Sequence, residues 1–303
     1  MSRVARVPAQ AKINLLLRVL AREQSGFHSL ETVFLRLTLS DDVVVRAGEG
    51  IRGRSIDCRG ELIAREALGP AERNLAYRAA VAYADATGWP AAFAIEIDKR
   101  IPVGGGLGGG SADAGAVLRA LDAMAPVPLG DRLPELAIDL GADVPFLSLD
   151  SPMALGWGRG ERLFPLPVLS PRPVVLVMPS FGVSTREAFE WLAHDRGGDA
   201  YVPRTAVLRP ADVDTWDGIA RTAVNEFEPV VARHHPEIGR CVDALRVAGA
   251  RLAMMSGSGS TVFGVFDGDS HARGALAAMT SGSGRPTVTV TQTADRVQRV
   301  EID

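Results

Sequence analysis

The chain has 303 residues and a formal net charge of −3, from 36 acidic and 33 basic side chains. This length predicts two domains with a core each, and the lack of a basic block argues against a nucleic-acid partner. The apolar run at 13–17 is short and has Lys12, Asn14 and Arg18 in and around it. It therefore argues against a signal peptide or membrane partner, and we expect a cytoplasmic protein.

Two residue types are used sparingly. Cys58 and Cys241 lie far apart and in no metal-ligand spacing, so they favour a reducing compartment and predict neither a disulfide nor a metal site. Lysine occurs only as Lys12 and Lys99 among the 33 basic residues. Arginine cannot replace a compact ammonium beside a phosphate or a reacting oxygen, so both lysines are candidate functional residues. The alternative is that they occur by chance.

The first half of the chain is expected to open with strands. Alternating apolar residues at 9–20 predict a strand with Lys12 and Asn14 on one face. The other expected segments are strands at 31–39 and 42–46, a helix at 74–87, a strand at 92–97, a glycine loop at 104–110 and helices at 111–124 and 133–140. Asp143 then falls in a turn before Pro145.

The second half restarts after a proline-rich passage at 165–173, so we expect domains at 1–165 and 166–303. Ser184 and Glu187 have the spacing of a capping box for a helix through Leu192. The other expected segments are a strand at 173–178, helices at 225–233 and 238–248, and a hairpin with arms at 251–255 and 261–266 around the loop 256–260. This mixture predicts an α+β fold.

The strongest chemical signal is a glycine loop between the expected strand at 92–97 and the helix after it. The loop runs through Pro102, Val103, Gly104, Gly105, Gly106, Leu107, Gly108, Gly109, Gly110 and Ser111. So many glycines are costly to order, but they let backbone amides face a polyphosphate at the start of a helix. The pattern is neither a Walker A loop nor a dinucleotide fingerprint. The alternative is a flexible connection.

The glycine loop resembles the phosphate loop of the GHMP kinase superfamily, named for galactokinase, homoserine kinase, mevalonate kinase and phosphomevalonate kinase. Its paired glycine triplets resemble the branch that acts on 4-diphosphocytidyl-2-C-methylerythritol. Further motifs follow the order and spacing of that branch: Ala11-Lys12-Ile13-Asn14-Leu15, Gly26-Phe27-His28, Asp98-Lys99-Arg100-Ile101-Pro102, Gly141-Ala142-Asp143-Val144-Pro145 and Ser256-Gly257-Ser258-Gly259-Ser260. The resemblance implies a ribosomal protein S5 domain 2-like first domain and a ferredoxin-like second domain.

The resemblance also implies a reaction, in which ATP phosphorylates the 2-hydroxyl of the methylerythritol unit in the non-mevalonate (MEP) pathway of isoprenoid biosynthesis. It makes Asp143 the base that takes the hydroxyl proton, with Lys12 stabilising developing negative charge. Phosphoryl transfer needs in-line positioning and charge neutralisation above all. Without the motifs, Asp143 could cap a turn and Lys12 could be an exposed strand residue.

By the same resemblance, Asn14, Phe27, His28 and Thr185 bind the substrate, with Phe27 stacking on cytosine where relatives often carry tyrosine. Asn74, Lys99 and the loop residues 102–111 would line the ATP site. Alone, Asn74 could be only a helix N-cap, and Thr185 lies beside one. Mg²⁺ should accompany ATP, with most of its ligands from the nucleotide phosphates.

Two other functions stay open at this point. A kinase acting on mevalonate, homoserine or a sugar would keep the phosphate loop but would not need the Gly26-Phe27-His28 motif. A regulator that binds nucleotide without turnover would not need both Lys12 and Asp143. The oligomeric state does not follow from the sequence.

Overall fold

The computed structural model describes residues 2–22, 28–60, 70–197, 208–280 and 286–303. An eight-stranded sheet forms its first half, with the order β12-β1-β2-β4-β3; β5 also pairs with β2 and β6, and β8 with β1. Its strands are β1 (Ser2–Arg22), β2 (His28–Gly48), β3 (Arg54–Arg59), β4 (Phe93–Asp98), β5 (Met153–Gly158), β6 (Arg162–Pro165), β8 (Val224–Asn225) and β12 (Glu301–Ile302).

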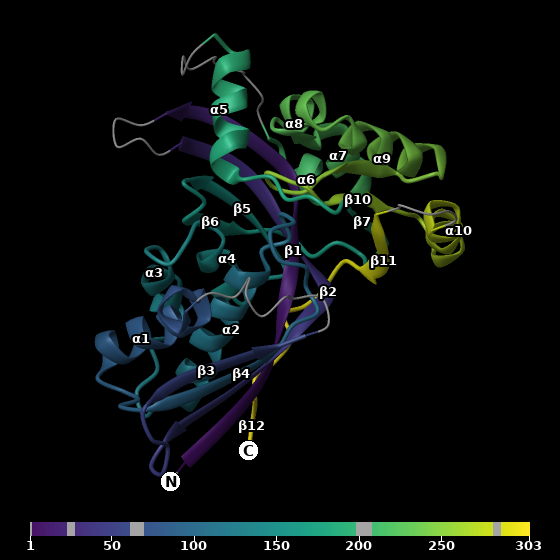
Figure 1. Ribbon diagram of the computed structural model, residues 1–303. Helices are drawn as coiled ribbons and strands as arrows, with labels where there is room; N and C mark the ends of the chain where they lie inside the picture. Colours follow the sequence, from purple (N-terminus) through teal and green to yellow (C-terminus); the bar gives the residue numbers. More distant parts are fainter. Residues whose placement is uncertain (1, 23–27, 61–69, 198–207, 281–285) are drawn as a thin grey trace.

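Four helices accompany this sheet and lie on one side of β1 and β2 (Figure 1). They are α1 (Leu75–Thr87), α2 (Gly109–Met124), α3 (Leu133–Ala137) and α4 (Val144–Ser148). Helix α2 is the central one, because ten of its sixteen residues are buried and it contacts the sheet and the other three helices. Single 3-10 turns at Ala71–Arg73 and Gly130–Arg132 precede α1 and α3.

A four-stranded antiparallel sheet with the order β11-β7-β10-β9 forms the second half. Its strands are β7 (Pro173–Met178), β9 (Leu252–Met255), β10 (Val262–Val265) and β11 (Thr287–Gln292), and its helices are α5 (Thr185–Asp195), α6 (Pro210–Val213), α7 (Trp216–Thr222), α8 (Glu228–His234), α9 (Pro236–Val247) and α10 (Asp269–Thr280). None of the helices in the described ranges is long and apolar enough to cross a membrane.

The apolar core divides into two clusters, and β1 contributes to both of them. Ile13 and Leu15 belong to the larger cluster, which includes residues of helices α1 to α4 and also Leu176 and Phe263 of the second sheet. Leu17 and Val19 belong to the smaller one, with the second sheet and helices α8 to α10. The long first strand therefore ties the two halves of the molecule together.

The predicted α+β fold and the hairpin around 256–260 are confirmed. The boundary after residue 165 stays a prediction. Strands β8 and β12, which lie beyond it, join the first sheet by pairing with β1. The halves are thus connected by more than the passage at 165–173.

The expected elements whose bounds differ in the structure include two strands and two helices. The strands expected at 31–39 and 42–46 form the single strand β2, because register shifts against β1 let one long strand bend without ending. The helix expected at 225–233 begins only at Glu228, since Asn225 pairs with Leu17 in β8. Helix α2 begins at Gly109, two residues early, after Gly108 turns the chain at φ +71°.

Candidate active site

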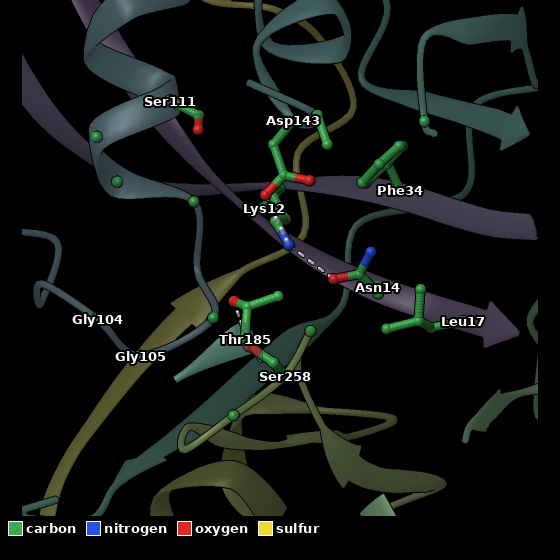
Figure 2. Close-up of a pocket in the computed structure, with 18 of the residues that line it drawn as sticks. Lys12, Asn14, Leu17, Phe34, Gly104, Gly105, Ser111, Asp143, Thr185 and Ser258 are labelled. Atoms are coloured by element: carbon green, nitrogen blue, oxygen red, sulfur yellow. Dashed lines mark hydrogen bonds and ion pairs between the residues drawn. The ribbon is translucent and has the colours of Figure 1, made fainter. Parts of the chain in front are cut away.

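A cavity of about 450 Å³ lies where the two halves meet. Figure 2 shows its lining drawn together from the start of α2, strand β1, the N-terminus of α4 and two segments of the second half. The predicted site residues that line it are Lys12, Asn14, Lys99, Pro102, Val103, Gly104, Gly105, Gly106, Gly108, Gly109, Gly110, Ser111, Asp143 and Thr185. Segments up to 247 residues apart along the chain thus reach one cavity, as Lys12 and Gly259 show.

Lys12, Asn14 and Asp143 form a connected polar group in this cavity. The Lys12 ammonium lies 3.2 Å from Asp143 Oδ2 and donates to Asn14 Oδ1 at 2.7 Å. Asn14 Nδ2 donates to Thr32 Oγ1 at 2.8 Å, and that hydroxyl donates to the Leu16 carbonyl. Alternation along β1 puts Lys12 and Asn14 on the same face, as the sequence predicts. Each amide and hydroxyl in the group has a partner, so its geometry is fixed before any ligand binds.

Asp143 is the more exposed member of the ion pair. Its side chain is 30% exposed against 4% for Lys12. It occupies the N-cap position of α4, in the turn expected from Gly141 to Pro145, but its side chain does not cap the helix. The backbone carbonyl of Asp143 accepts a hydrogen bond from Leu147 N at 3.1 Å. The carboxylate is therefore positioned by the helix and faces the cavity.

Three carbonyl groups of the glycine loop accept hydrogen bonds from the surrounding protein. The Leu107 carbonyl accepts from Lys12 N at 2.9 Å, the Gly106 carbonyl from Ser256 Oγ at 2.9 Å, and the Gly105 carbonyl from Thr261 N at 3.2 Å. Leu107 itself is buried and does not line the cavity. Because these acceptors point into the protein, the loop is ordered without nucleotide.

Gly106 is a position where only glycine fits. Its φ is +78°, and a Cβ atom there would lie 2.1 Å from the Ser256 carbonyl oxygen. The loop 256–260, which the sequence resemblance likens to a third glycine motif, thus contacts the phosphate loop backbone to backbone. The second half of the chain therefore supports the phosphate loop directly.

Lys99 lines the cavity, but its ammonium is turned toward two buried carboxylates. It pairs with Asp41 and with Asp113 Oδ2, the latter at 2.6 Å. Burial opposes its charge, yet the two carboxylates outweigh that effect and raise its pKa. Asp41 also accepts from the backbone N–H of Ile101 at 2.7 Å. Lys99 thus anchors the approach to the phosphate loop to the start of α2.

Asp113 is a buried carboxyl group of this cluster, and its charged form is disfavoured. Burial and the nearby charge of Asp41 raise its pKa to about 8, although Lys99 acts in the opposite direction. Its Oδ1 has no hydrogen-bond partner among the described residues. Asp113 stands near the start of α2, and its other oxygen accepts the hydrogen bond from Lys99.

Asn74 does not line this cavity. Its Oδ1 accepts from Ala76 N at 2.9 Å, which makes it the N-cap of α1, and its Nδ2 lies 3.6 Å from Cys58 Sγ. Burial raises the pKa of Cys58 to about 11. The neighbouring Leu75 lines the cavity instead.

A second cavity of about 1180 Å³ adjoins the first and contains His28. The His28 ring stacks on Phe189, with centroids 4.0 Å apart and an interplanar angle of 14°. Phe27 and Gly26 lie outside the described residues. The residues that line both cavities are Leu30, Ala142, Arg159, Thr185 and Phe189. A ligand of sufficient length can therefore extend from one cavity into the other.

Thr185 is the first residue of α5 and lies at the junction of the two cavities. Its hydroxyl is 3.0 Å from the Ser258 hydroxyl (Figure 2). The adjacent Ser184 and Glu187 form the predicted capping box. Thr185 is thus placed by the helix start and available to a ligand.

Asn225 supports the site from outside the cavity, and sequence reasoning missed it. Its buried Nδ2 donates to the carbonyls of Met255 and Gly257, both at 2.8 Å, and its Oδ1 accepts from Phe227 N. Glu228 adds a bond from Met255 N at 2.7 Å. Both side chains hold the loop that supports the phosphate loop. The sequence offers no signal for this beyond a polar residue inside an apolar helix pattern.

Relatives of known description share this arrangement over most of the chain. Residues 74–150 match the family GHMP kinases N terminal domain, and residues 214–285 match GHMP kinases C terminal. The 4-diphosphocytidyl-2-C-methyl-D-erythritol kinase of Geobacter sp. (strain M21) is 37% identical over 270 residues, which cover 89% of this chain and 92% of that protein. Its counterpart in Anaeromyxobacter dehalogenans (strain 2CP-C) is 42% identical over 279 residues, covering 89% and 83%.

A solved structure agrees with these relatives. The crystal structure of a 4-(cytidine 5'-diphospho)-2C-methyl-D-erythritol kinase superposes with a TM-score of 0.76 at 35% identity, covering 95% of this chain and 99% of that one. The fold and the phosphate loop define a two-domain kinase of the GHMP type. Within that class, the chain belongs to the 4-diphosphocytidyl-2-C-methyl-D-erythritol kinase family.

Proposed function

We propose that this enzyme transfers the γ-phosphoryl group of ATP to the 2-hydroxyl of 4-diphosphocytidyl-2-C-methyl-D-erythritol, giving the 2-phosphate and ADP in the MEP pathway. The observation that carries the proposal is the Lys12–Asp143 ion pair, which shares one cavity with the glycine loop. A carboxylate beside an ammonium meets the two needs of the reaction. One group accepts the proton, and the other neutralises negative charge.

The phosphoryl transfer would proceed in line across this cavity. Asp143 accepts the proton of the substrate 2-hydroxyl while the oxygen of that hydroxyl forms a bond to the γ-phosphorus. The bond from phosphorus to the β,γ-bridging oxygen breaks, and ADP leaves with the bonding electrons. Lys12 lies 3.2 Å from Asp143 Oδ2, close enough to stabilise charge on the entering oxygen and the transferred group.

The two cavities suggest how the substrate lies. Its methylerythritol end would occupy the cavity of Lys12, Asn14 and Asp143, and its cytidyl end the adjoining cavity of His28 and Phe189. Among the five residues that line both cavities, only Arg159 is cationic. We place the diphosphate of the substrate beside it, because a guanidinium fork suits phosphate oxygens.

Mg²⁺ would accompany ATP and neutralise charge on the β- and γ-phosphates. No cluster of three or more histidine, cysteine or acidic side chains suited to a metal occurs in the described part of the chain. The oxygen donors in the cavity include the partly exposed Asp143 carboxylate and the Ser111 hydroxyl. They fit a cation that takes most of its ligands from the nucleotide and water.

We also place the enzyme in the cytoplasm, which the free Cys58 and Cys241 favour. Its ligands are two small molecules, ATP and the cytidyl substrate, and we propose no nucleic-acid or membrane partner.

The proposal is tested by measuring ADP release from magnesium-ATP with four alcohols: 4-diphosphocytidyl-2-C-methyl-D-erythritol, mevalonate, homoserine and galactose. Turnover with the cytidyl substrate alone is the expected result. Turnover with another alcohol would keep the kinase and overturn the substrate assignment. Binding of ATP without any turnover would identify a regulator instead.

A further inference from the structure

A second buried cation lies beside Lys12 on the neighbouring strand. The register of β1 and β2 pairs Lys12 with Arg36 and Asn14 with Phe34. Residues directly opposite each other in an antiparallel pair project to the same face, so Arg36 faces the helix layer together with Lys12. Arg36 is only 1% exposed. No step of the reaction described above uses it.

The Arg36 guanidinium binds the C-terminal end of α4. Its Nη2 donates to the carbonyls of Phe146 and Leu149, both at 2.9 Å, and its Nε donates to the Ser151 carbonyl at 3.2 Å. These carbonyls include the ones that a helix leaves unsatisfied, and they carry partial negative charge. Burial lowers the pKa of Arg36 to about 9, so the group remains charged at neutral pH.

Helix α4 is thereby held at both ends by cations from paired positions. Lys12 binds Asp143 at the N-terminal end, and Arg36 binds the carbonyls at the C-terminal end. A helix of five residues is only about 7 Å long, and the hydrogen bond from Leu147 N to the Asp143 carbonyl runs along it. A shift at one end is therefore passed to the other.

Packing around α4 removes other ways for it to adjust. A Cβ atom at Gly115 of α2 would lie 2.4 Å from the Leu147 carbonyl oxygen, so α4 rests directly on the α2 backbone. The Phe146 ring lies 5.1 Å from the Arg36 guanidinium and stacks on Phe34 at 4.9 Å. Close-packed groups of this kind transmit displacement and do not absorb it.

We propose that Arg36 is a positioning residue for Asp143: it fixes α4 through three carbonyl contacts and so holds the carboxylate at its working distance from Lys12. The inference rests on the proposed role of Asp143 as the base. Misplacement of a reacting group by about 1 Å can cost on the order of 100-fold in rate. Loss of Arg36 should therefore lower kcat and leave the binding of ATP intact.

The test compares Arg36→Met and Arg36→Lys with wild type for kcat and for the KM of ATP and of the cytidyl substrate. Arg36→Met should lower kcat by roughly 10- to 100-fold, with the KM of ATP changed less than about twofold. Arg36→Lys, which keeps the charge, should recover part of kcat. The control is Arg196→Met, because partly buried Arg196 also binds a backbone carbonyl, that of Val19, and lines neither cavity. A kcat of folded Arg36→Met equal to that of Arg196→Met would overturn the proposal.

A double-mutant comparison separates positioning from general structural loss. The Arg36→Lys substitution should lower the single-turnover rate of the wild-type enzyme. It should hardly change the rate of the Asp143→Asn variant, because Arg36 acts through Asp143. Equal losses in both backgrounds would refute the positioning role even if Arg36→Met does not fold. An Asp143→Asn variant with full activity would instead overturn the proposed base itself.

Discussion

At the scale of single residues, the ion pair of Lys12 and Asp143 divides two tasks by exposure. Lys12 is buried and bonded to Asn14, whereas Asp143 keeps nearly a third of its side chain open to the cavity. The buried partner is fixed in place and the open one can meet a hydroxyl. A group that moves a proton must reach the substrate, so Asp143 is the better candidate for the base.

Replacing Asp143 with asparagine tests this division. We expect Asp143→Asn to lower kcat at least ~100-fold, the usual contribution of a general base, with little change in the affinity for ATP. Steady-state kinetics together with calorimetric titration of ATP measures both. Asp131→Asn is the control, because Asp131 is exposed and lines neither cavity. Unchanged kcat in Asp143→Asn would contradict the assignment.

Asp113 predicts a dependence of stability on pH. Its pKa rises from 3.8 to about 8 on folding, so between these values the folded protein binds a proton that the unfolded chain has released. The carboxyl therefore destabilises the fold increasingly as the pH rises through this window. Asp113→Asn should remove the effect. Its Tm relative to wild type should rise between pH 5 and pH 8, by at least ~3 °C or about 1 kcal/mol.

Calorimetry at several pH values, in buffers whose enthalpy of ionisation is small, would measure that difference. Glu96→Gln serves as the control, since Glu96 is a partly exposed acid paired with Arg46 outside the buried cluster. A Tm difference that stays constant, or that falls toward pH 8, would show that Asp113 is charged in the folded protein throughout the range.

At the scale of elements, the contact between the phosphate loop and the loop 256–260 depends on Gly106. Gly104→Ala and Gly106→Ala both place alanine at φ +78°, which costs about 1 kcal/mol. A Cβ atom at Gly104 meets nothing within 4 Å, but at Gly106 it overlaps the Ser256 carbonyl. Without nucleotide, Gly106→Ala should therefore lower the Tm clearly more than Gly104→Ala. Equal losses in a thermal melt would argue against this contact.

Local sequence signals account for several elements well. The capping box of Ser184 and Glu187, the alternation along β1 and the turn at Asp143 each depend on neighbouring residues, and the structure has all three. The sequence does not predict that Gly109 lies inside α2, because the pair Gly109-Gly110 is typical of a loop. The helix can begin there because Gly108 adopts a left-handed conformation.

Contacts between distant segments could not be predicted in the same way. Nothing near Lys99 indicates that its ammonium turns toward Asp41 and Asp113, since that choice follows from the packing of β2 against α2. Asn225 likewise gains its role only when β8 pairs with β1. The family resemblance predicts which residues lie at the site. The contacts that their side chains make there follow only from the fold.

At the scale of the whole molecule, the two adjoining cavities predict separate sites for the two ends of the substrate. Arg159→Gln should raise the KM of the cytidyl substrate at least ~10-fold, because a charge-assisted bond to the diphosphate is lost, and leave the KM of ATP unchanged. Arg132→Gln is the matched control, since exposed Arg132 lines neither cavity. Equal effects of both variants would contradict a specific role for Arg159.

The pairing of β8 and β12 with β1 has a consequence for dividing the gene. A fragment ending at residue 165 would lack both strands and leave backbone groups of β1 unpaired, with Leu17 and Val19 deprived of their cover. Such open strand edges recruit other chains. We therefore expect the fragment to aggregate when it is produced alone, and to be rescued only when the remainder of the polypeptide is supplied to complete it.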